Sequence, residues 1–221
     1  MNKIRTSTEA VSCIRNNNRI MVGGFGLVGC PITLLDSLSR HNVNGLTIIS
    51  NNLGEVGGKG LDKLLQQNQI SKAIGSYFTG NPNVVRFVEE GDLQVELTPQ
   101  GTLAEAIRAG GAGLGGFFTR TTLNTALSEF KERKWIDGVE YVFEKSLRAH
   151  VALVKAWKAD KLGNLIYYKT ARNFNPMMAT AADICIAEVD EIVEIGELDP
   201  ESIVTSHLYV DIVVKSGGSL A

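Results

Sequence analysis

Short apolar runs and helical apolar patterns follow one another along the chain. Residues 20–22 and 46–50 are mainly apolar rather than alternating with polar residues, which is typical of strands buried on both faces of a parallel sheet. After the first run, Leu34, Leu35 and Leu38 recur at helical spacing. A proline immediately before them fits the first helical position, where its missing N–H is no loss. The two patterns predict a strand that leads into a helix.

The same succession predicts further elements. Thr6 and Glu9 form the capping-box pattern, so a first helix is expected to begin there and to end near residue 16. Thr102 and Glu105 form a second such pattern, which gives Glu105 a capping role. Further helices are predicted at 61–65, at 83–90 and after Pro176, and further strands at 72–77, 93–98, 150–155, 165–168 and 184–188. Together they indicate an α/β fold: a mostly parallel open sheet with helices on both faces.

Residues 131–143 interrupt this rhythm. Asp137 and Gly138 separate two β-prone runs, and this dipeptide is a strong signal for the turn of a β-hairpin. The hairpin is expected to form a small flap on a single domain that spans residues 1–216. Residues 217–221 are predicted to be a disordered tail, because they are small and lie at the end of the chain.

Composition excludes several kinds of partner. The 221 residues are 44% hydrophobic and carry a net charge of −2, so no broad basic field is available to bind nucleic acid. Charged residues interrupt the apolar windows near the N-terminus, and no stretch approaches about 18 apolar residues, so neither a signal peptide nor a membrane anchor is predicted. Three widely spaced cysteines without a C-x-x-C pair argue against disulfides or zinc and fit a reducing cytoplasm.

The most distinctive segment is the glycine-rich turn between the first strand and the helix after it. Such a turn brings backbone N–H groups and the positive end of a helix dipole to one point, which favours an anion there. Gly24, Gly26 and Gly29 also satisfy the dinucleotide fingerprint. However, the second strand ends at Asn51 and Asn52 instead of the acidic residue that would hold a ribose. A simpler alternative is a turn that serves only tight strand-to-helix packing.

Other candidate residues carry weaker signals. Cys30 lies in the glycine-rich turn without a histidine near it in sequence, so a buried inert thiol is favoured over a nucleophile. The three histidines form no ligand pattern, and the acidic residues of 188–201 are interpreted as a solvated face. Residues 110–116 hold five glycines and predict a flexible or close-approach loop beside a ligand. We therefore assign no metal site.

Several long blocks are more specific than any of these motifs. They read Asn16-Asn17-x-x-Ile20-Met21-Val22-Gly23-Gly24-Phe25-x-x-x-Gly29-x-Pro31, then Ile49-Ser50-Asn51-Asn52, then Val95-Glu96-Leu97-Thr98-Pro99-Gln100-Gly101-Thr102-Leu103-Ala104-Glu105, then Ile107-Arg108-Ala109-Gly110-Gly111-Ala112-Gly113, then Ala152-Leu153-Val154-Lys155-Ala156-Trp157-Lys158-Ala159-Asp160, then Ala171-Arg172-Asn173-Phe174-Asn175-Pro176. In this order they resemble the A, or alpha, subunit of family I coenzyme A transferases. The resemblance covers nearly the whole chain and is strongest to the succinyl-CoA:3-ketoacid and acetoacetate transferases.

The resemblance implies one half of an enzyme. A 3-oxoacid coenzyme A transferase moves coenzyme A from succinyl-CoA or acetyl-CoA to a short-chain or 3-oxo acid, such as acetoacetate, by a ping-pong route. Its glutamate nucleophile belongs to the B subunit, in a serine-glutamate-asparagine-glycine block that this chain lacks. The implied assembly is an A2B2 heterotetramer with its active site between the subunits. Coenzyme A is a substrate there, and no cofactor is tightly bound.

The resemblance also assigns site residues. Asn51 and Gln100 match polar groups that contact the substrate and the developing oxyanion, and for Asn51 an amide that bonds to its own turn is an equal alternative. Arg120 lies where residues 119–122 depart from the family pattern, and either contacts a substrate carboxylate or lies exposed. The implied contacts for coenzyme A are Gly24, Phe25, Gly26, Leu27, Val28, Gly29 and Cys30.

Two other functions stay open at this stage. One is a non-catalytic subunit that binds coenzyme A or serves as a scaffold. The other is an enzyme of the sugar-phosphate isomerase kind, which shares this architecture, and fold alone does not separate the two chemistries. The acid pair also stays open among succinate, acetate, butyrate, acetoacetate and 3-oxoadipate.

Overall fold

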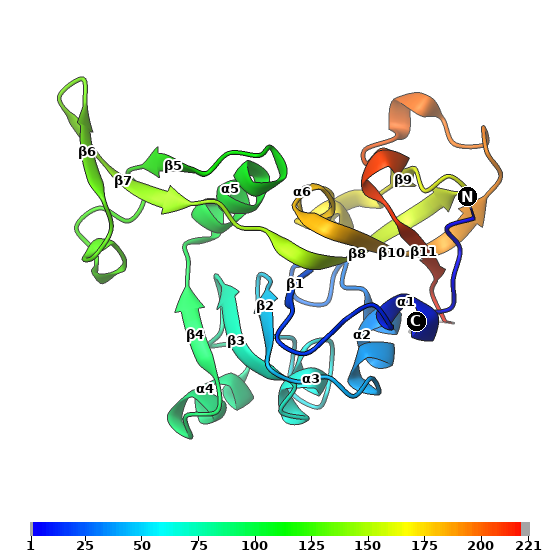
Figure 1. The fold of residues 1–221 in the computed structure, drawn as a ribbon, viewed down its shortest axis with the longest axis horizontal. Helices are drawn as coiled ribbons and strands as arrows, with labels where there is room; N and C mark the ends of the chain where they lie inside the picture. The colour runs from blue at the N-terminus through cyan, green and yellow to red at the C-terminus, as the bar shows by residue number, and fades with distance from the viewer. Residues whose placement is uncertain (1, 218–221) are drawn as a thin grey trace.

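A computed structural model describes residues 2–217 and shows one large sheet with a smaller sheet beside it (Figure 1). The large sheet has eight strands in the order β11-β10-β8-β1-β2-β3-β4, with β9 paired to β8. All of these pairings are parallel except β8 with β9. The strands are β1 (Arg19–Val22), β2 (Leu46–Ile49), β3 (Ile70–Gly75), β4 (Gln94–Leu97), β8 (Ala149–Asp160), β9 (Leu165–Ile166), β10 (Ala182–Val193) and β11 (Ile212–Lys215).

Helices cover both faces of the large sheet. On one face lie α1 (Ser7–Val11), α2 (Ile32–Ser39), α3 (Asp62–Gln66) and α4 (Pro82–Glu89), and on the other α5 (Gln100–Gly111) and α6 (Asn175–Thr180). Successive strand residues supply the two cores, since Ile20 and Val22 of β1 pack with the first group of helices and Met21 with the second. The predicted fold class, a mostly parallel open sheet with helices on both faces, is confirmed.

The smaller sheet is antiparallel and projects from the body of the molecule (Figure 1). It contains β5 (Gly116–Thr119), β6 (Arg133–Ile136) and β7 (Val139–Lys145) in the order β5-β7-β6. The predicted hairpin is confirmed: Asp137 and Gly138 join β6 to β7, with positive φ angles of 50° and 75°. The third strand, β5, was not predicted. We call residues 116–145 the arm.

Two helix starts differ in how well the sequence predicted them. The first capping box is confirmed, because the Glu9 N–H donates to Thr6 Oγ1 at 3.3 Å and the Thr6 N–H to Glu9 Oε2 at 2.9 Å. However, α1 ends at Val11 rather than near residue 16. The second capping box is wrong: α5 already begins at Gln100, so Thr102 lies inside the helix, and Glu105 pairs with Arg108 at 2.6 Å instead.

The strands of the C-terminal third differ most from the prediction. Strands β8 and β10 each have twelve residues and extend beyond the predicted 150–155 and 184–188, while β11 was not predicted. Short 3-10 helices complete the fold at Ala126–Ser128, Lys169–Arg172, Pro200–Ser202 and His207–Tyr209. The predicted tail, 217–221, lies outside the described residues except for Gly217, whose N–H donates to Thr33 Oγ1 at 3.2 Å. That residues 1–216 form one domain stays a prediction.

Candidate functional site

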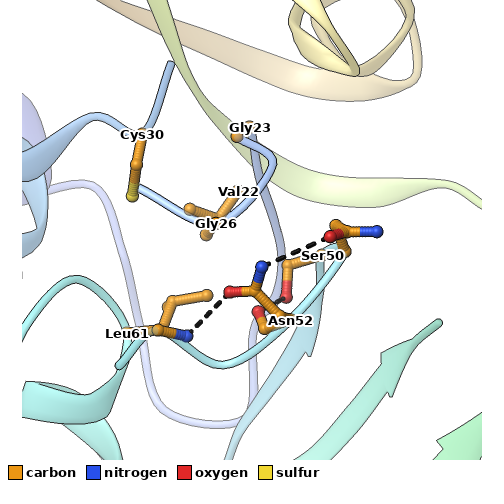
Figure 2. A pocket seen from close by; sticks show the side chains of 10 residues that line it. Val22, Gly23, Gly26, Cys30, Ser50, Asn52 and Leu61 are labelled. Atoms are coloured by element: carbon orange, nitrogen blue, oxygen red, sulfur yellow. Dashed lines mark hydrogen bonds between the residues drawn. The ribbon is translucent and has the colours of Figure 1, made fainter. Parts of the chain in front are cut away.

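A narrow cleft lies at the carboxyl ends of β1 and β2, where parallel strands place the loops that follow them. Its walls come from the glycine turn after β1 and from the polar residues after β2, which face each other in Figure 2. The lining residues are Val22, Gly23, Gly24, Gly26, Cys30, Ser50, Asn51, Asn52, Gly54 and Leu61. No carboxylate and no cationic side chain is among them. The cleft offers backbone and amide groups rather than charge.

The glycine turn is a small hairpin of its own. The Phe25 N–H donates to Val28 O at 3.0 Å, and the Val28 N–H returns a bond to Phe25 O at 3.3 Å. Gly24 and Gly26 have φ angles of 125° and 61°, which residues with a side chain rarely adopt. A side chain at Gly26 would still meet no atom within 4 Å, so open space lies beside this backbone. A ligand can therefore approach the main chain there.

Two asparagines from a distant segment hold this turn in place. Asn173 accepts from the Gly24 N–H at 3.1 Å and donates to Val28 O at 2.9 Å. Asn175 is fully buried, donates to Gly29 O at 3.0 Å and occupies the space where Gly23 would carry a side chain. The sequence motifs gave these residues no role. The available signal was their place in the Ala171–Pro176 block, where two asparagines flank a phenylalanine.

The start of α2 is occupied by a carboxylate of the chain itself. Glu188, on β10, accepts from the Leu34 N–H at 3.1 Å and from Thr33 Oγ1 at 3.1 Å. Lys155 lies 3.3 Å from the same carboxylate. The sequence predicted that a bound anion would lie at this helix start. That prediction is wrong, because the buried carboxylate of Glu188 already accepts the hydrogen bonds that the anion would take. The prediction that the acidic residues of 188–201 form a solvated face is also wrong for Glu188, which is 2% exposed.

Cys30 is a poor nucleophile in this setting. Its side chain is buried, and burial raises the pKa of the thiol to about 12, with a smaller contribution from the negative charge of Glu188. Because the thiolate is the nucleophilic form, the thiol is inert near neutral pH. The structure favours the inert thiol that the sequence suggested.

Asn51 lies in the cleft, but its amide is already engaged. The side chain is buried, donates from Nδ2 to Ser76 Oγ at 2.7 Å and accepts at Oδ1 from the Asn52 amide at 3.3 Å. Asn52 in turn accepts from the Gly54 N–H at 2.9 Å, which ties the start of the loop to the cleft wall (Figure 2). The structure thus brings Asn51 together with the glycine turn, in an orientation fixed by a chain of amides.

Gln100 lies elsewhere on the same edge of the sheet. It is the first residue of α5, directly after β4, and its side chain is exposed. It does not line the cleft. The predicted turn at this position is the start of a helix, whose cap residue Pro99 makes no side-chain hydrogen bond. The exposed amide of Gln100 thus lies at the positive end of α5.

The loop after β2 is fixed by a buried carboxylate, Asp62. It accepts from the Gly58 N–H at 2.8 Å and from the side-chain amides of Asn81 and Asn83, both at 2.9 Å, and of Gln66 at 2.5 Å. Burial alone would raise the pKa of Asp62, but these four hydrogen bonds outweigh it and hold the pKa below its ordinary value. The loop is thereby anchored, and a second hollow of about 250 Å³ opens between it and Tyr77.

Large apolar side chains stand about half exposed around this edge of the sheet. They follow or end the first four strands, and they are Phe25, Val28, Val56, Tyr77 and Leu97. Scattered exposed apolar residues are ordinary, but a group at the carboxyl ends of four adjacent strands marks a surface for contact. We call this group the apolar rim.

The remaining candidates lie away from the cleft. Gly110 and Gly111 end α5, where added side chains would meet Leu147 O and Thr180 Oγ1, so this close approach is between parts of the chain. Arg120 is exposed on the arm. Among residues 2–217, no three His, Cys, Asp or Glu side chains gather closely enough to hold a metal ion. Over the same residues, no helix combines the length and the apolar character needed to cross a bilayer.

Comparison with known proteins identifies relatives across nearly the whole chain. Residues 4–216 match the coenzyme A transferase family. A Bacillus subtilis protein, named as the probable A subunit of a succinyl-CoA:3-ketoacid coenzyme A transferase, is 51% identical over 211 residues, 96% of this chain and 88% of its own. The alpha subunit of the acetate CoA-transferase of Escherichia coli K12 is 43% identical over 214 residues, 97% of each chain.

A solved structure shows the same fold. The acyl-CoA transferase of Escherichia coli O157:H7, in a thioester complex with CoA, superposes with a TM-score of 0.85 at 20% sequence identity. The match covers 97% of this chain and 47% of the other, so the chain spans about half the length of that protein. On the family match and these relatives, the resemblance read from the sequence blocks is confirmed, and the chain belongs to the coenzyme A transferase family.

Proposed function

We propose that this chain is the A subunit of a 3-oxoacid coenzyme A transferase and that a B subunit supplies the glutamate nucleophile. The observation that carries the proposal is the cleft, which has amides and open backbone but no carboxylate. Transfer between acids needs a carboxylate, because only that group can form a mixed anhydride with the acid and then a thioester with coenzyme A. The nucleophile must therefore come from outside the cleft, and we propose that the B subunit supplies it.

The apolar rim supports the same conclusion. Phe25, Val28 and Tyr77 are about half exposed beside the cleft and the hollow next to it. A partner that covers them would exclude water from the reacting groups and strengthen every hydrogen bond made to a developing charge. We propose an A2B2 heterotetramer in which the B subunit covers this edge of the sheet.

The chain's own residues would bind and orient. The open backbone of the glycine turn, from Gly24 to Cys30, is proposed to contact coenzyme A, since Gly26 leaves space for it. Asn51 and Gln100 are proposed as polar contacts for the oxyanions, and one fixed donor of this kind contributes about 3 kcal/mol in the transition state. Because Asn51 is held by Ser76, it is pre-oriented, whereas Gln100 is free to adjust.

The substrates are proposed from the relatives and the cellular location from the thiols. Relatives are named for succinyl-CoA:3-ketoacid, acetate and 3-oxoadipate transfer, so succinyl-CoA or acetyl-CoA is the proposed donor and a 3-oxo or short-chain acid the acceptor. Cys13, Cys30 and Cys185 are free, in keeping with a reducing cytoplasm.

Reconstitution tests the proposal. The purified chain should show no transferase turnover, and co-expression with the B-type subunit of the same genome should restore it. A panel of succinate, acetate, acetoacetate and 3-oxoadipate, with succinyl-CoA and acetyl-CoA as donors, identifies the acid pair. Mass spectrometry of the reconstituted enzyme, after incubation with the acyl-CoA donor alone, should place the coenzyme A thioester on the B subunit. Turnover by the isolated chain would contradict the two-subunit proposal.

A further inference from the structure

The hollow of about 250 Å³ between the loop after β2 and Tyr77 adjoins the cleft. Gly26, Asn52 and Gly54 line both, so a molecule bound in the cleft can extend into the hollow. The rest of its wall comes from the loop after β2 and from the segment after β3, and consists of Leu53, Glu55, Tyr77, Gly80 and Asn81. The hollow is therefore an extension of the proposed active site.

The size of the hollow fits a short acid. Pockets for larger organic ligands usually measure about 300–1,000 Å³, and this hollow lies below that range. In the proposed reaction, an acid brings its carboxylate to the cleft, where the nucleophile of the B subunit attacks. The carbon chain of the acid must then lie in space beside the cleft, and the hollow provides such space.

The walls of the hollow are fixed before a ligand arrives. Asn81 donates to the main chain of the loop after β2 at 3.1 Å, and Glu55 and Lys59 exchange backbone hydrogen bonds of 3.1 and 3.2 Å. On the other side, the ring of Tyr77 lies against Gly80, where a side chain would come within 2.7 Å of it. A preformed site lowers the ordering cost of binding and keeps the backbone of Glu55 beside the hollow.

The hollow carries one negative charge. Of the described residues that line it, only Glu55 is charged, and its side chain is exposed. Within residues 2–217, Glu55 belongs to no ion pair. Lys59, its backbone partner, does not line the hollow, and Lys63 is paired with Asp36. No cation of this chain therefore offsets the Glu55 carboxylate where a ligand would meet it.

We infer that the hollow holds the carbon chain of the transferred acid and that Glu55 selects acids without a second carboxylate. The far carboxylate of succinate would lie beside Glu55, and like charges repel each other, more strongly once a partner excludes water. The chains of acetate, butyrate and acetoacetate end in a methyl group and meet no such repulsion.

This selection applies to the donor as well as the acceptor. In a ping-pong route the two acids occupy the same place in turn, so acetyl-CoA is favoured over succinyl-CoA as the donor. The inference rests on the proposed function and deepens it, because it names the class of acid: a monocarboxylate.

The test compares two acids of equal chain length. Butyrate and succinate differ at the far end, which is a methyl group in one and a carboxylate in the other. With acetyl-CoA as donor and chromatography of the new acyl-CoA, the reconstituted wild-type enzyme should have a kcat/KM for butyrate about tenfold or more above that for succinate. A higher kcat/KM for succinate would overturn the inference.

Variants of Glu55 assign the preference to its charge. Glu55→Gln should reduce the ratio of the two kcat/KM values about fivefold through succinate alone, and Glu55→Lys should reduce it further. Because the Glu55 side chain is exposed, the melting temperature should not change. Glu201→Gln removes the same charge from an exposed position that lines neither the cleft nor the hollow, and its ratio should match the wild type.

Two results with Glu55→Gln would overturn the inference. One is an unchanged ratio. The other is an equal change with both acids, which would mean that the hollow takes part of coenzyme A instead of the acid. Added salt supplies a second readout on the wild type, since ions screen a repulsion between exposed charges but leave the fit of the chain unchanged. The preference for butyrate should therefore shrink with salt, and a constant preference would assign it to shape and overturn the role of Glu55.

The same assays separate this inference from the proposed function. If the reconstituted enzyme transfers coenzyme A but its preference ignores Glu55, the inference fails alone and the proposed function stands. If it transfers coenzyme A to no acid, the proposed function fails and the inference fails with it.

Discussion

Helices α2 and α5 both begin at the carboxyl edge of the large sheet, and their first turns are completed in opposite ways. At α2, the Glu188 carboxylate accepts from the Leu34 N–H and from Thr33 Oγ1. At α5, Pro99 offers no capping bond, Gln100 is exposed and Thr102 Oγ1 has no partner within residues 2–217. One positive helix end is closed by the chain itself, and the other is open.

This difference suggests that the start of α2 contributes to stability and the start of α5 to binding. A helix end closed by a buried carboxylate cannot accept a second anion, so α2 contributes to the fold and only its glycine turn faces the cleft. The open end of α5 can instead face a charge that develops during a reaction, where a preoriented amide helps most. The sequence pattern favoured the reverse, with an anion at α2 and a capping box at α5.

The largest effect is expected from opening the closed end. Glu188→Ala leaves the Leu34 N–H and Thr33 Oγ1 without their acceptor and Lys155 with Asp190 as its remaining carboxylate, so the free energy of unfolding should fall by about 3 kcal/mol. Urea denaturation measures it. The control Glu191→Ala breaks an ion pair with Lys158 whose carboxylate side is half exposed, and it should cost less than about 1 kcal/mol. Equal losses would show that the closure of α2 adds no stability.

The next effect is expected at the open end, and it is kinetic. Gln100→Ala should lower kcat and kcat/KM together by about 10²-fold in the reconstituted enzyme, because a donor to the oxyanion acts in the transition state. Because the Gln100 side chain is exposed, the melting temperature should not change. Gln94→Ala removes another exposed amide, at the far end of β4, and should leave both constants as they are. A lowered melting temperature with normal kcat would assign Gln100 to the scaffold.

A buried carboxylate that anchors a loop instead of a helix start, that of Asp62, offers a pH test. Asp62→Asn should cost about 1–3 kcal/mol near neutral pH, since it weakens bonds from Gly58, Asn81 and Asn83. The folded-state pKa of Asp62 lies below its ordinary value of 3.8. Its stabilisation is therefore complete above that value and is lost as the pH falls through the folded pKa. Denaturation of both proteins from pH 7 to pH 3 should show the difference shrinking, and a constant difference would contradict this account.

The smallest effect is expected from the unpartnered hydroxyl of α5. Thr102→Val in the isolated chain should raise the free energy of unfolding by about 1 kcal/mol, because no internal hydrogen bond is lost and an unsatisfied buried polar atom is removed. Thermal melts measure it. A loss of more than about 2 kcal/mol would mean that Thr102 has an internal partner and that the start of α5 is closed after all.

Local signals predicted the elements that local interactions define. The mainly apolar runs at 20–22 and 46–50 became β1 and β2, Thr6 and Glu9 form their capping box, and the Asp137-Gly138 turn joins β6 to β7. The cleft was predicted through the glycine turn and Asn51, since the carboxyl ends of adjacent parallel strands must meet at one edge. Their roles in binding and catalysis stay predictions.

Interactions between distant segments account for what the sequence did not show. Glu188 looked like part of a solvated run, but it lies opposite Lys155 in the register of β8 and β10, as Glu191 lies opposite Lys158. The matching spacing of three residues in the two runs was a signal of this pairing. The cap of α5 was placed at Thr102, three residues after the observed cap at Pro99, because Thr102 and Glu105 fit a local motif that the fold does not use. A pattern with two structural solutions needs tertiary packing to choose between them.

The asparagine clamp on the glycine turn also dictates when the site can form during synthesis. The hydrogen bonds of Asn173 and Asn175 join residues far apart in the sequence. Asn173 bonds to Gly24 across 149 positions and to Val28 across 145, and Asn175 bonds to Gly29 across 146. A nascent chain that has emerged from the ribosome only as far as β4 carries the turn without its clamp. Long-range closure of this kind is slow and comes late, because the entropy of the intervening chain must be lost first. The cleft is therefore a product of the last third of translation, although its walls are among the first residues made.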